Sequence, residues 1–393
     1  MTRLSRRARN FQPFYAMAVA AEASRLAAAG NDVIRLSLGE PDTGAPPRVL
    51  AALEEIARES RPLPYTDALG LSELRRAIAQ RYRDLHGIKI APERVCVTAG
   101  ASAALLLVSA ALVDPGDRVL LGDPSYPCNR QFLATFGADV ALIPTRPETR
   151  YQLDASLVEE NWTEDTRGVL IASPSNPTGT SVETEELARI CEFARARGGW
   201  RVIDEIYLEL SDDRADGRRP ASVLATDPEA IVISSFSKYF GMTGWRLGWA
   251  IVPEDMVEAM DRLAQNLLIC PSTPAQIAAL ECFHPESIRW CEARRDLFSQ
   301  RRAAATEALA DLGLPVPVAP DGAFYVYFDV SSTGMSMSAD EFCARALSEC
   351  GVALTPGRDF GPLTADTHVR LSCSASIEDI REGIARLAPL VRR

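Results

Sequence analysis

The sequence predicts an α/β protein with a large domain built on a mostly parallel seven-stranded sheet, followed by a smaller α+β domain. Two observations support this prediction. Between about Arg94 and Pro253, short β-branched segments alternate with helical segments. This alternation indicates a parallel sheet, because parallel strands need crossover connections, which are usually helices. After about Phe283 the alternation stops, and the 393 residues of the chain exceed what one compact core usually supports.

The strands expected in the large domain are seven short apolar segments, at Val95–Thr98, Arg118–Leu121, Val140–Ile143, Gly168–Ala172, Arg201–Asp204, Ile231–Ser234 and Leu247–Val252. Helical patterns lie between several of them, at Ser102–Leu112, Glu183–Arg197 and Met256–Leu268. Ligands of parallel sheets bind at the carboxyl ends of the strands, and the polar clusters of this chain lie at those ends.

The C-terminal part has a different pattern of a long charged helix, an aromatic strand, a shorter helix and a last strand, at Pro285–Leu312, Ala323–Phe328, Ala339–Cys350 and His368–Ser372. An alanine-rich helix at Met17–Ala29 is expected to pack against this part. We therefore expect an N-terminal arm and helix at residues 1–45, a large domain at 46–283 and a small domain at 284–393.

The composition is that of a soluble globular protein, with 47% apolar and 24% charged residues. A net charge of −11 argues against a nucleic-acid partner and against an anionic membrane surface. Nine scattered cysteines without a C-x-x-C motif indicate reduced thiols in a cytoplasm rather than disulfides or a zinc site. With three histidines, a His-rich metal site is not expected.

The segment around Lys238 is the most informative part of the sequence. The strand at Ile231–Ser234 continues into Ser235, Phe236 and Ser237, and Lys238 follows. Arg246 comes eight positions later, in a glycine-rich loop. The hydroxyl groups and the guanidinium could hold a phosphate, and a lysine beside them suits Schiff-base chemistry. The alternative is an ordinary loop lysine with an arginine nearby.

Asp204 and Tyr207 form a second candidate pair at a strand end. Asp204 ends the buried strand at Arg201–Asp204, where a carboxylate needs a partner or a shifted pKa. A protonated heterocyclic nitrogen would be such a partner, and Tyr207 could direct its hydroxyl at the same ligand. Alternatively, Asp204 caps the helix that follows.

Three more strand ends carry weaker signals. Asn176 begins an Asn-Pro-Thr-Gly turn and is either an amide donor or an ordinary turn residue. Ala101 and Ser102 follow a small-residue turn, and the helix that starts there has free N–H groups suited to phosphate. Tyr126 could stack on a planar ligand or simply pack in the core.

Arg370 lies within an apolar strand near the C-terminus, at Val369–Ser372. Arginine is rarely fully buried unless it is paired. Its planar group matches a carboxylate through two hydrogen bonds. The partner is therefore either an internal Asp or Glu or the carboxylate of a substrate.

The order and spacing of these features resemble the class I/II aminotransferases, pyridoxal-phosphate enzymes of fold type I similar to aspartate aminotransferase. The segment Leu38–Asp42, which reads LGEPD, and the segment Tyr65–Arg75 resemble the family as well. The resemblance extends over almost the whole chain, from Leu38 to Arg370. It implies a homodimer that acts on amino acids and 2-oxo acids.

The resemblance also implies roles for individual residues around the cofactor ring. Lys238 would bind pyridoxal phosphate covalently and later move a proton at the substrate Cα. Asp204 would pair with the pyridine nitrogen, and Tyr126 would stack on the ring. Asn176 and Tyr207 would donate hydrogen bonds to the phenolic oxygen.

The remaining roles concern the phosphate and the substrate. The phosphate would be held by groups from both subunits: Ala101, Ser102, Ser235 and Arg246 of one chain, and Tyr65 of the neighbour. Arg370 would bind the α-carboxylate of the substrate, with the Gly39 backbone and Asn176 beside it.

The implied activity is transfer of an amino group from an L-amino acid to a 2-oxo acid by a ping-pong mechanism. A carbon–sulfur β-lyase on the same fold and a non-catalytic regulatory module are the alternatives. No arginine or lysine of the sequence can be assigned to a distal carboxylate. Aspartate, aromatic, alanine and branched-chain donors therefore stay open.

Overall fold

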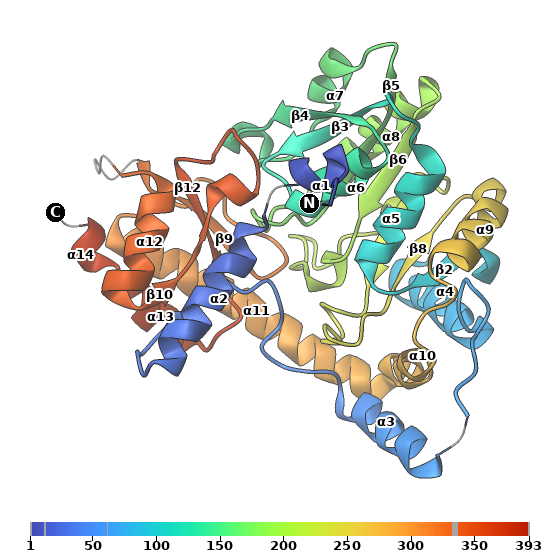
Figure 1. Ribbon diagram of the computed structural model, residues 1–393, viewed down its shortest axis with the longest axis horizontal. Helices are drawn as coiled ribbons and strands as arrows, with labels where there is room; N and C mark the ends of the chain where they lie inside the picture. Colours follow the sequence, from blue (N-terminus) through green and yellow to red (C-terminus); the bar gives the residue numbers. More distant parts are fainter. Residues whose placement is uncertain (1, 12, 61, 332–336, 392–393) are drawn as a thin grey trace.

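The computed structural model describes residues 2–11, 13–60, 62–331 and 337–391. Its centre is a seven-stranded sheet in the order β2 (Val95–Thr98), β8 (Gly248–Ile251), β7 (Ile231–Ser235), β6 (Trp200–Asp204), β5 (Thr166–Ala172), β3 (Arg118–Asp123) and β4 (Asp139–Pro144) (Figure 1). Only β8 runs antiparallel to its neighbours, β7 and β2. The predicted mostly parallel, seven-stranded sheet is confirmed.

Both faces of this sheet are covered, so successive strand residues enter two different cores. On β5, Val169 and Ile171 belong to one core and Leu170 to the other. Leu170 faces the core formed with α5 (Ala101–Leu112) and α9 (Val257–Leu267), and the other core includes α8 (Thr184–Ala196) and α4 (Ser72–His86). Because both faces are buried, these strands are continuous apolar segments without polar alternation.

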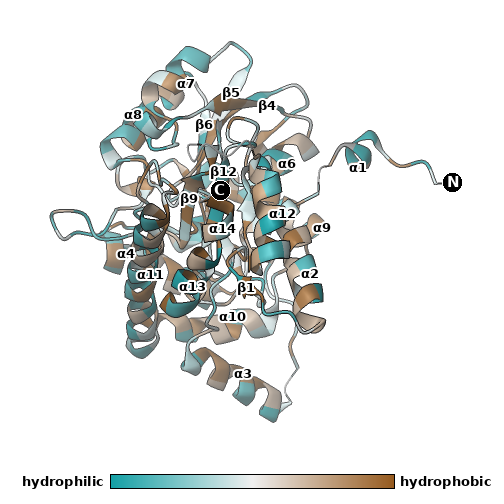
Figure 2. Ribbon diagram, turned by 90° about the vertical axis from the view of Figure 1, so that its left-hand side faces the viewer, coloured by the Kyte–Doolittle hydropathy of each residue, from teal (hydrophilic) through white to brown (hydrophobic). Residues whose placement is uncertain are grey.

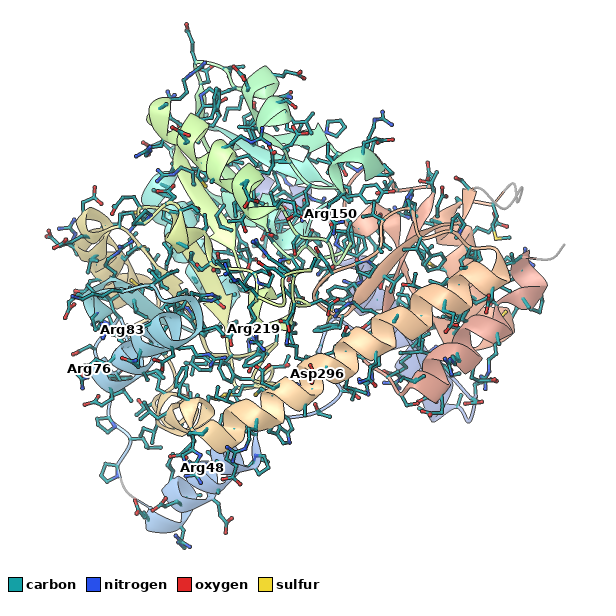
Figure 3. The ribbon with its side chains drawn as sticks, turned by 180° about the vertical axis from the view of Figure 1, so that it is seen from behind. Arg48, Arg76, Arg83, Arg150, Arg219 and Asp296 are labelled. Atoms are coloured by element: carbon teal, nitrogen blue, oxygen red, sulfur yellow. The ribbon has the colours of Figure 1, made fainter. Side chains whose placement is uncertain are left out.

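The C-terminal part is joined to the large sheet by the helix α11 (Pro285–Leu312), which spans the molecule when seen from behind (Figure 3). Here β11 (Thr355–Pro356), β12 (His368–Ser372) and β9 (Tyr325–Asp329) form an antiparallel sheet. A short parallel pair joins β1 (Ile34–Arg35) to β10 (Val352–Ala353). The remaining helices of this part are α12 (Ala339–Cys350), α13 (Ile377–Arg386) and α14 (Ala388–Val391).

The N-terminal helix α2 (Tyr15–Ala28) packs against β10 and β11, far away in sequence. It begins two residues before the predicted start at Met17. The reason is that the carboxylate of Asp359 accepts the N–H groups of Tyr15 and Ala16, at 2.8 and 2.7 Å. This cap comes from 343 residues along the chain, so local sequence cannot indicate it.

Most predicted elements differ from the structure by one or two residues at their ends. Four agree at both ends: Val95–Thr98, Pro285–Leu312, Ala339–Cys350 and His368–Ser372. Several helices were not predicted: α1 (Arg6–Asn10), α3 (Pro47–Glu59), α4, α6 (Pro127–Thr135), α7 (Ala155–Asn161) and α10 (Thr273–Ala279). In Figure 2, α3 lies at the edge of the molecule and carries hydrophobic residues. No helix in the described part of the chain is long and apolar enough to cross a lipid bilayer.

Candidate active site

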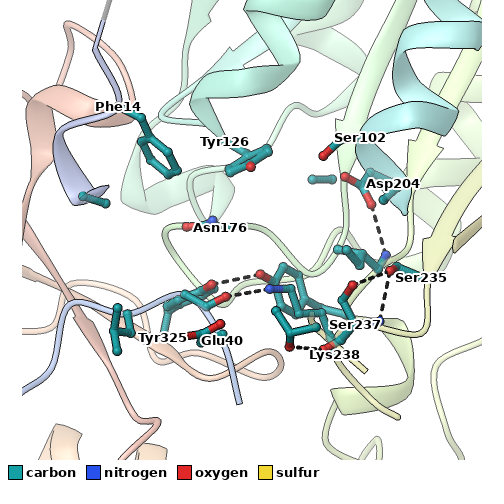
Figure 4. Close-up of a pocket in the computed structure, with 18 of the residues that line it drawn as sticks. Phe14, Glu40, Ser102, Tyr126, Asn176, Asp204, Ser235, Ser237, Lys238 and Tyr325 are labelled. Atoms are coloured by element: carbon teal, nitrogen blue, oxygen red, sulfur yellow. Dashed lines mark hydrogen bonds between the residues drawn. The ribbon is translucent and has the colours of Figure 1, made fainter. Parts of the chain in front are cut away.

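A cavity of about 320 Å³ opens at the carboxyl ends of β5, β6 and β7. Eleven of the twelve predicted site residues line it: Gly39, Ala101, Ser102, Tyr126, Asn176, Asp204, Tyr207, Ser235, Lys238, Arg246 and Arg370. Figure 4 shows Asp204, Ser235, Tyr126 and Lys238 around the same open space. These four residues follow or end the strands β3, β6 and β7 of one sheet, so the fold itself brings them together.

Lys238 lies three residues beyond the end of β7, and its Nζ donates a hydrogen bond to the carbonyl oxygen of Gly39 at 2.6 Å. Burial lowers the pKa of Lys238 to about 8, Glu40 opposes this effect, and the charges of Arg370 and Arg246 add to it. An amine with this pKa is partly uncharged near neutral pH and can act as a nucleophile or a base.

Asp204 ends β6 and is buried in the wall of the cavity. Burial raises the pKa of its carboxyl group to about 6, although Oδ1 accepts the backbone N–H of Ile206 at 3.1 Å and Lys238 is positively charged. The helix cap considered as the alternative is not what the structure shows, because the 3₁₀ helix that follows, Leu208–Leu210, has Tyr207 at its N-cap. The bond to Ile206 closes a turn, and the Asp204 side chain lines the cavity.

Two tyrosines from different parts of the chain, Tyr207 and Tyr325, meet in the wall of the cavity. The hydroxyl oxygens of Tyr207 and Tyr325 are 2.9 Å apart. Tyr325 lies on β9 and lines the cavity, yet the sequence indicated only an aromatic strand at this position. The two tyrosines are 118 residues apart, so only the folded chain reveals the contact.

Arg370 is 1% exposed, and its hydrogen-bond partners answer the question left open by the sequence. Its Nη1 donates to Oδ1 of Asn176 at 2.8 Å, and its Nη2 donates to the carbonyl oxygen of Ser37 at 2.8 Å and to Oγ1 of Thr355 at 3.3 Å. All these acceptors are neutral. A buried guanidinium with neutral partners at the edge of a cavity is well placed to receive an anion.

The residues predicted to bind the phosphate lie close together because β8 pairs with both β7 and β2. The register places Gly248 opposite Ser235 and opposite Thr98. A Cβ atom on Gly248 would lie 2.7 Å from the backbone nitrogen of Ala101, so only glycine permits this close approach. The first turn of α5 and the Ser235 hydroxyl thereby meet at one end of the cavity.

Arg246 closes the same end of the cavity. Its guanidinium contacts Gly100, where an added Cβ would lie 2.5 Å from Nη2. Its Nη1 donates to the carbonyl oxygen of Thr243 at 3.0 Å. A hydroxyl group, a guanidinium and a helix N-terminus are groups that can hold a phosphate dianion.

Arg294 is a further residue that the sequence did not reveal. It projects from α11 and is buried. Its guanidinium donates to the carbonyl oxygen of Lys238 at 3.2 Å and to that of Gly44 at 3.2 Å, and also to that of Tyr239. It thereby links the Lys238 segment to the loop that follows Gly39. In sequence, this arginine looks like any other charged residue of a long helix.

Several other residues that line the cavity had no predicted role, among them Phe14, Met17, Ser37 and Glu40. Tyr65 is the one predicted site residue that does not line it, and its side chain is 82% exposed. Its expected role concerned the neighbouring subunit, which a single chain does not contain.

The fold and this cavity define a lysine-centred α/β enzyme with a built-in anion site. The sequence profile of the family "Aminotransferase class I and II" matches residues 31–387, so the chain belongs to that family. Enzymes of this family use pyridoxal phosphate. The predicted family and fold class are confirmed.

Relatives and solved structures agree with this assignment. The chain is 39% identical to a valine–pyruvate aminotransferase of Mycobacterium tuberculosis over 95% of both chains, and 33% identical to an aspartate/prephenate aminotransferase of Thermus thermophilus over 100% of both. It superposes on the crystal structure of an aminotransferase from Mycobacterium tuberculosis with a TM-score of 0.93 and 38% identity over 100% of both chains.

The chain is therefore an aminotransferase, which moves an amino group between an amino acid and a 2-oxo acid. This confirms the predicted enzyme class. The carbon–sulfur β-lyase alternative is not favoured, since the relatives are named as aminotransferases.

Proposed function

We propose that the cavity binds pyridoxal phosphate and that Lys238, Asp204 and Tyr207 carry out amino transfer there. The observation that supports this most strongly is the placement of three complementary groups around one space. Lys238 provides a partly uncharged amine, Asp204 a buried carboxyl group, and the start of α5 with Ser235 and Arg246 an anion site.

The residues of the cavity fit this cofactor. The α5 N-terminus at Ala101 and Ser102, with Ser235 and Arg246, would hold its phosphate. Asp204 would pair with the pyridine nitrogen, and Tyr126 would lie against the ring. When bound, pyridoxal phosphate supplies an aldehyde that takes up the amino group and a ring that withdraws electrons from the substrate Cα.

Each polar residue then has a defined task toward the substrate. Arg370, with Asn176 and the backbone at Gly39, binds the α-carboxylate and fixes the orientation of Cα. Tyr207 would donate to the phenolic oxygen of the cofactor. The Lys238 amine, with its pKa lowered to about 8, would accept the proton from Cα and return it to the cofactor carbon on the other side of the amino nitrogen.

The carboxylate role of Arg370 gives a direct test of the proposed function. We expect Arg370→Lys to lower kcat/KM for amino acids by at least ~10-fold, a loss of ~1.4 kcal/mol or more, because lysine keeps the charge but not the two parallel donors. Reaction with an amine that lacks the carboxylate should change much less. Steady-state kinetics with both substrates measures the difference.

Arg201→Lys is a matched control, since Arg201, on β6, is also buried but pairs with Asp227 and does not line the cavity. This variant should affect both substrates alike through stability alone. If Arg370→Lys also affects the amino acid and the simple amine equally, Arg370 supports the C-terminal part and does not recognise the substrate.

We also propose a homodimer with shared sites. Large apolar side chains are exposed on α3, at Leu50 and Leu53, and near α10, at Leu267 and Ile269. The Tyr65 segment lies beside α10, since Oγ1 of Thr273 donates to the carbonyl oxygen of Pro64 at 2.7 Å. Exposed apolar groups of this kind are typical of a protein interface.

If Tyr65 reaches the neighbour's phosphate, subunit mixing should restore activity. A dimer of one Lys238→Ala chain and one Tyr65→Phe chain has one site with both lesions and one with neither. Its activity should therefore exceed the mean of the two homodimers. Mixing Lys238→Ala with Asp204→Asn is the control, because both residues serve their own chain's site and neither site is then intact. A fully active monomer at nanomolar concentration would contradict the shared site.

We propose the same division of the chain as the sequence suggested. Residues 46–283 would form the cofactor-binding part, because Lys238, Asp204 and Arg246 lie within it. Residues 284–393 together with residues 1–45 would form the smaller part, because Arg370 lies there and α2 packs on β10 and β11. The nine cysteines carry free thiols, which supports a cytoplasmic location.

A further inference from the structure

One wall of the cavity comes from the N-terminal segment and has no role toward the cofactor. It consists of Phe14, Ala16, Met17 and Ala20, and Leu38, three residues after β1, also lines the cavity. All five side chains are apolar. With the α-carboxylate at Arg370 and the amino group at Lys238, this wall is the part of the cavity left for the substrate side chain.

The wall is held in place by contacts on both sides of it. Asp359 binds the first N–H groups of α2, at Tyr15 and Ala16. The ring of Phe14 meets that of Tyr126 edge-on, with centroids 6.2 Å apart and an interplanar angle of 81°. The apolar surface is therefore built into the fold beside the predicted ring position.

No cation among the described residues of this chain that line the cavity is left to pair with an acidic substrate side chain. Among the described residues that line it, the cations are Lys238, Arg246 and Arg370, and each already has a task toward the amino group, the phosphate or the α-carboxylate. Glu40 also lines the cavity, and it lies near enough to the Lys238 amine to raise its pKa. A second carboxylate on the substrate would meet this negative charge without compensation.

We infer that the amino donor is an amino acid with an uncharged aliphatic side chain of small or medium size, an inference that rests on the proposed function. Met17 lines the cavity yet is 64% exposed, so an aliphatic substrate side chain would cover it. A volume of about 320 Å³ is at the small end for ligand sites, and bound pyridoxal phosphate would take up part of it. Ala16 and Ala20 leave space for a short branched chain rather than a large ring.

The first experiment compares donors on the holoenzyme. The cofactor absorbance reports the first half-reaction with valine, leucine, aspartate, arginine or phenylalanine, each added alone. We expect kcat/KM for valine or leucine to exceed that for aspartate by at least ~10-fold. A faster reaction with aspartate, arginine or phenylalanine would overturn the inference while leaving the proposed function intact. No reaction with any donor would instead reject the proposed function.

The second experiment introduces a positive charge into the apolar wall by substitution. Met17→Arg places a cation where the substrate side chain is inferred to lie, and should raise the ratio of aspartate to valine kcat/KM by ~10-fold or more. Ala18→Arg adds the same charge on the next, exposed residue of α2, which does not line the cavity, and should leave the ratio unchanged.

Met17→Ser provides a variant without added charge. It should lower kcat/KM for leucine more than for alanine, because only the longer side chain would contact this position. Retained cofactor absorbance and an unchanged melting temperature show that each variant is folded. A ratio that moves equally in Met17→Arg and Ala18→Arg, or an equal effect of Met17→Ser on leucine and alanine, would overturn the assignment of this wall.

Discussion

Replacing Lys238 by alanine is expected to lower turnover by at least ~10²–10⁴-fold, since the variant lacks both the nucleophile and the group that moves the proton at Cα. The fold should persist, because the substitution removes the hydrogen bond from the amine to the carbonyl oxygen of Gly39 and leaves the backbone of this loop unchanged. Cofactor should still bind through the anion site, but without covalent attachment. Single-turnover kinetics and cofactor absorbance measure the two effects separately.

The composition of the chain supplies a matched control. It contains two lysines, Lys238 and the exposed Lys89. Reduction with borohydride followed by peptide mapping should find the cofactor on Lys238 in the wild type and in Lys89→Ala, and on neither lysine in Lys238→Ala. Lys89→Ala should keep normal turnover. Cofactor fixed to Lys89, or near-normal turnover in Lys238→Ala, would remove Lys238 from the mechanism.

The pKa of Lys238 adds a pH dependence to this test. Because burial lowers it to about 8, the amine is mostly protonated below that pH and mostly uncharged above it. The rate at which cofactor-free protein captures pyridoxal phosphate should therefore rise as the pH increases through about 8. Lys238→Ala should not show this rise.

The strands at whose ends the site lies were predictable because each can be recognised from its own short stretch of sequence. Lys238, Asp204 and Asn176 follow buried strands whose apolar residues can be recognised one segment at a time. In a parallel sheet the strand ends lie at one edge, so correct strands already bring these residues together. The small-residue turn before Ala101 was equally visible, although the close contact of its Gly100 with Arg246 was not.

The parts that could not be predicted depend on contacts between distant segments. Tyr325 meets Tyr207 through its hydroxyl, Arg294 reaches the carbonyl oxygen of Lys238 from α11, and Asp359 caps α2. In each case, the local sequence around one residue does not indicate which distant residue it will contact. The apolar wall around Phe14 and Met17 is the clearest example, because only the capped helix turns these residues toward the cavity.

Asp204→Asn is the second substitution for which we expect a large loss of rate. Burial raises the pKa of Asp204 to about 6, so at neutral pH the group is mainly a carboxylate and can keep a pyridine nitrogen protonated. An amide of the same shape cannot hold that proton. Losing such a charge-assisted partner costs ~2–4 kcal/mol of transition-state stabilisation, or roughly 30- to 1000-fold in kcat.

The same burial predicts that folding will suffer much less than catalysis. A carboxylate in this position is desolvated at a cost, and a neutral amide avoids that cost while still able to accept the N–H of Ile206. Thermal unfolding of Asp204→Asn should therefore stay close to the wild type while kcat falls. Measuring both quantities on the same preparation separates the two effects.

The neighbouring residue offers a control with the same chemistry. Glu205 is buried, its pKa is raised by burial to about 7, and its Oε1 accepts the N–H of Val223 at 2.7 Å. It does not line the cavity that contains Lys238. Glu205→Gln should change stability with little effect on the activity of the folded protein. If Asp204→Asn behaves in the same way, Asp204 is a structural carboxylate and the proposed contact with the pyridine nitrogen is wrong.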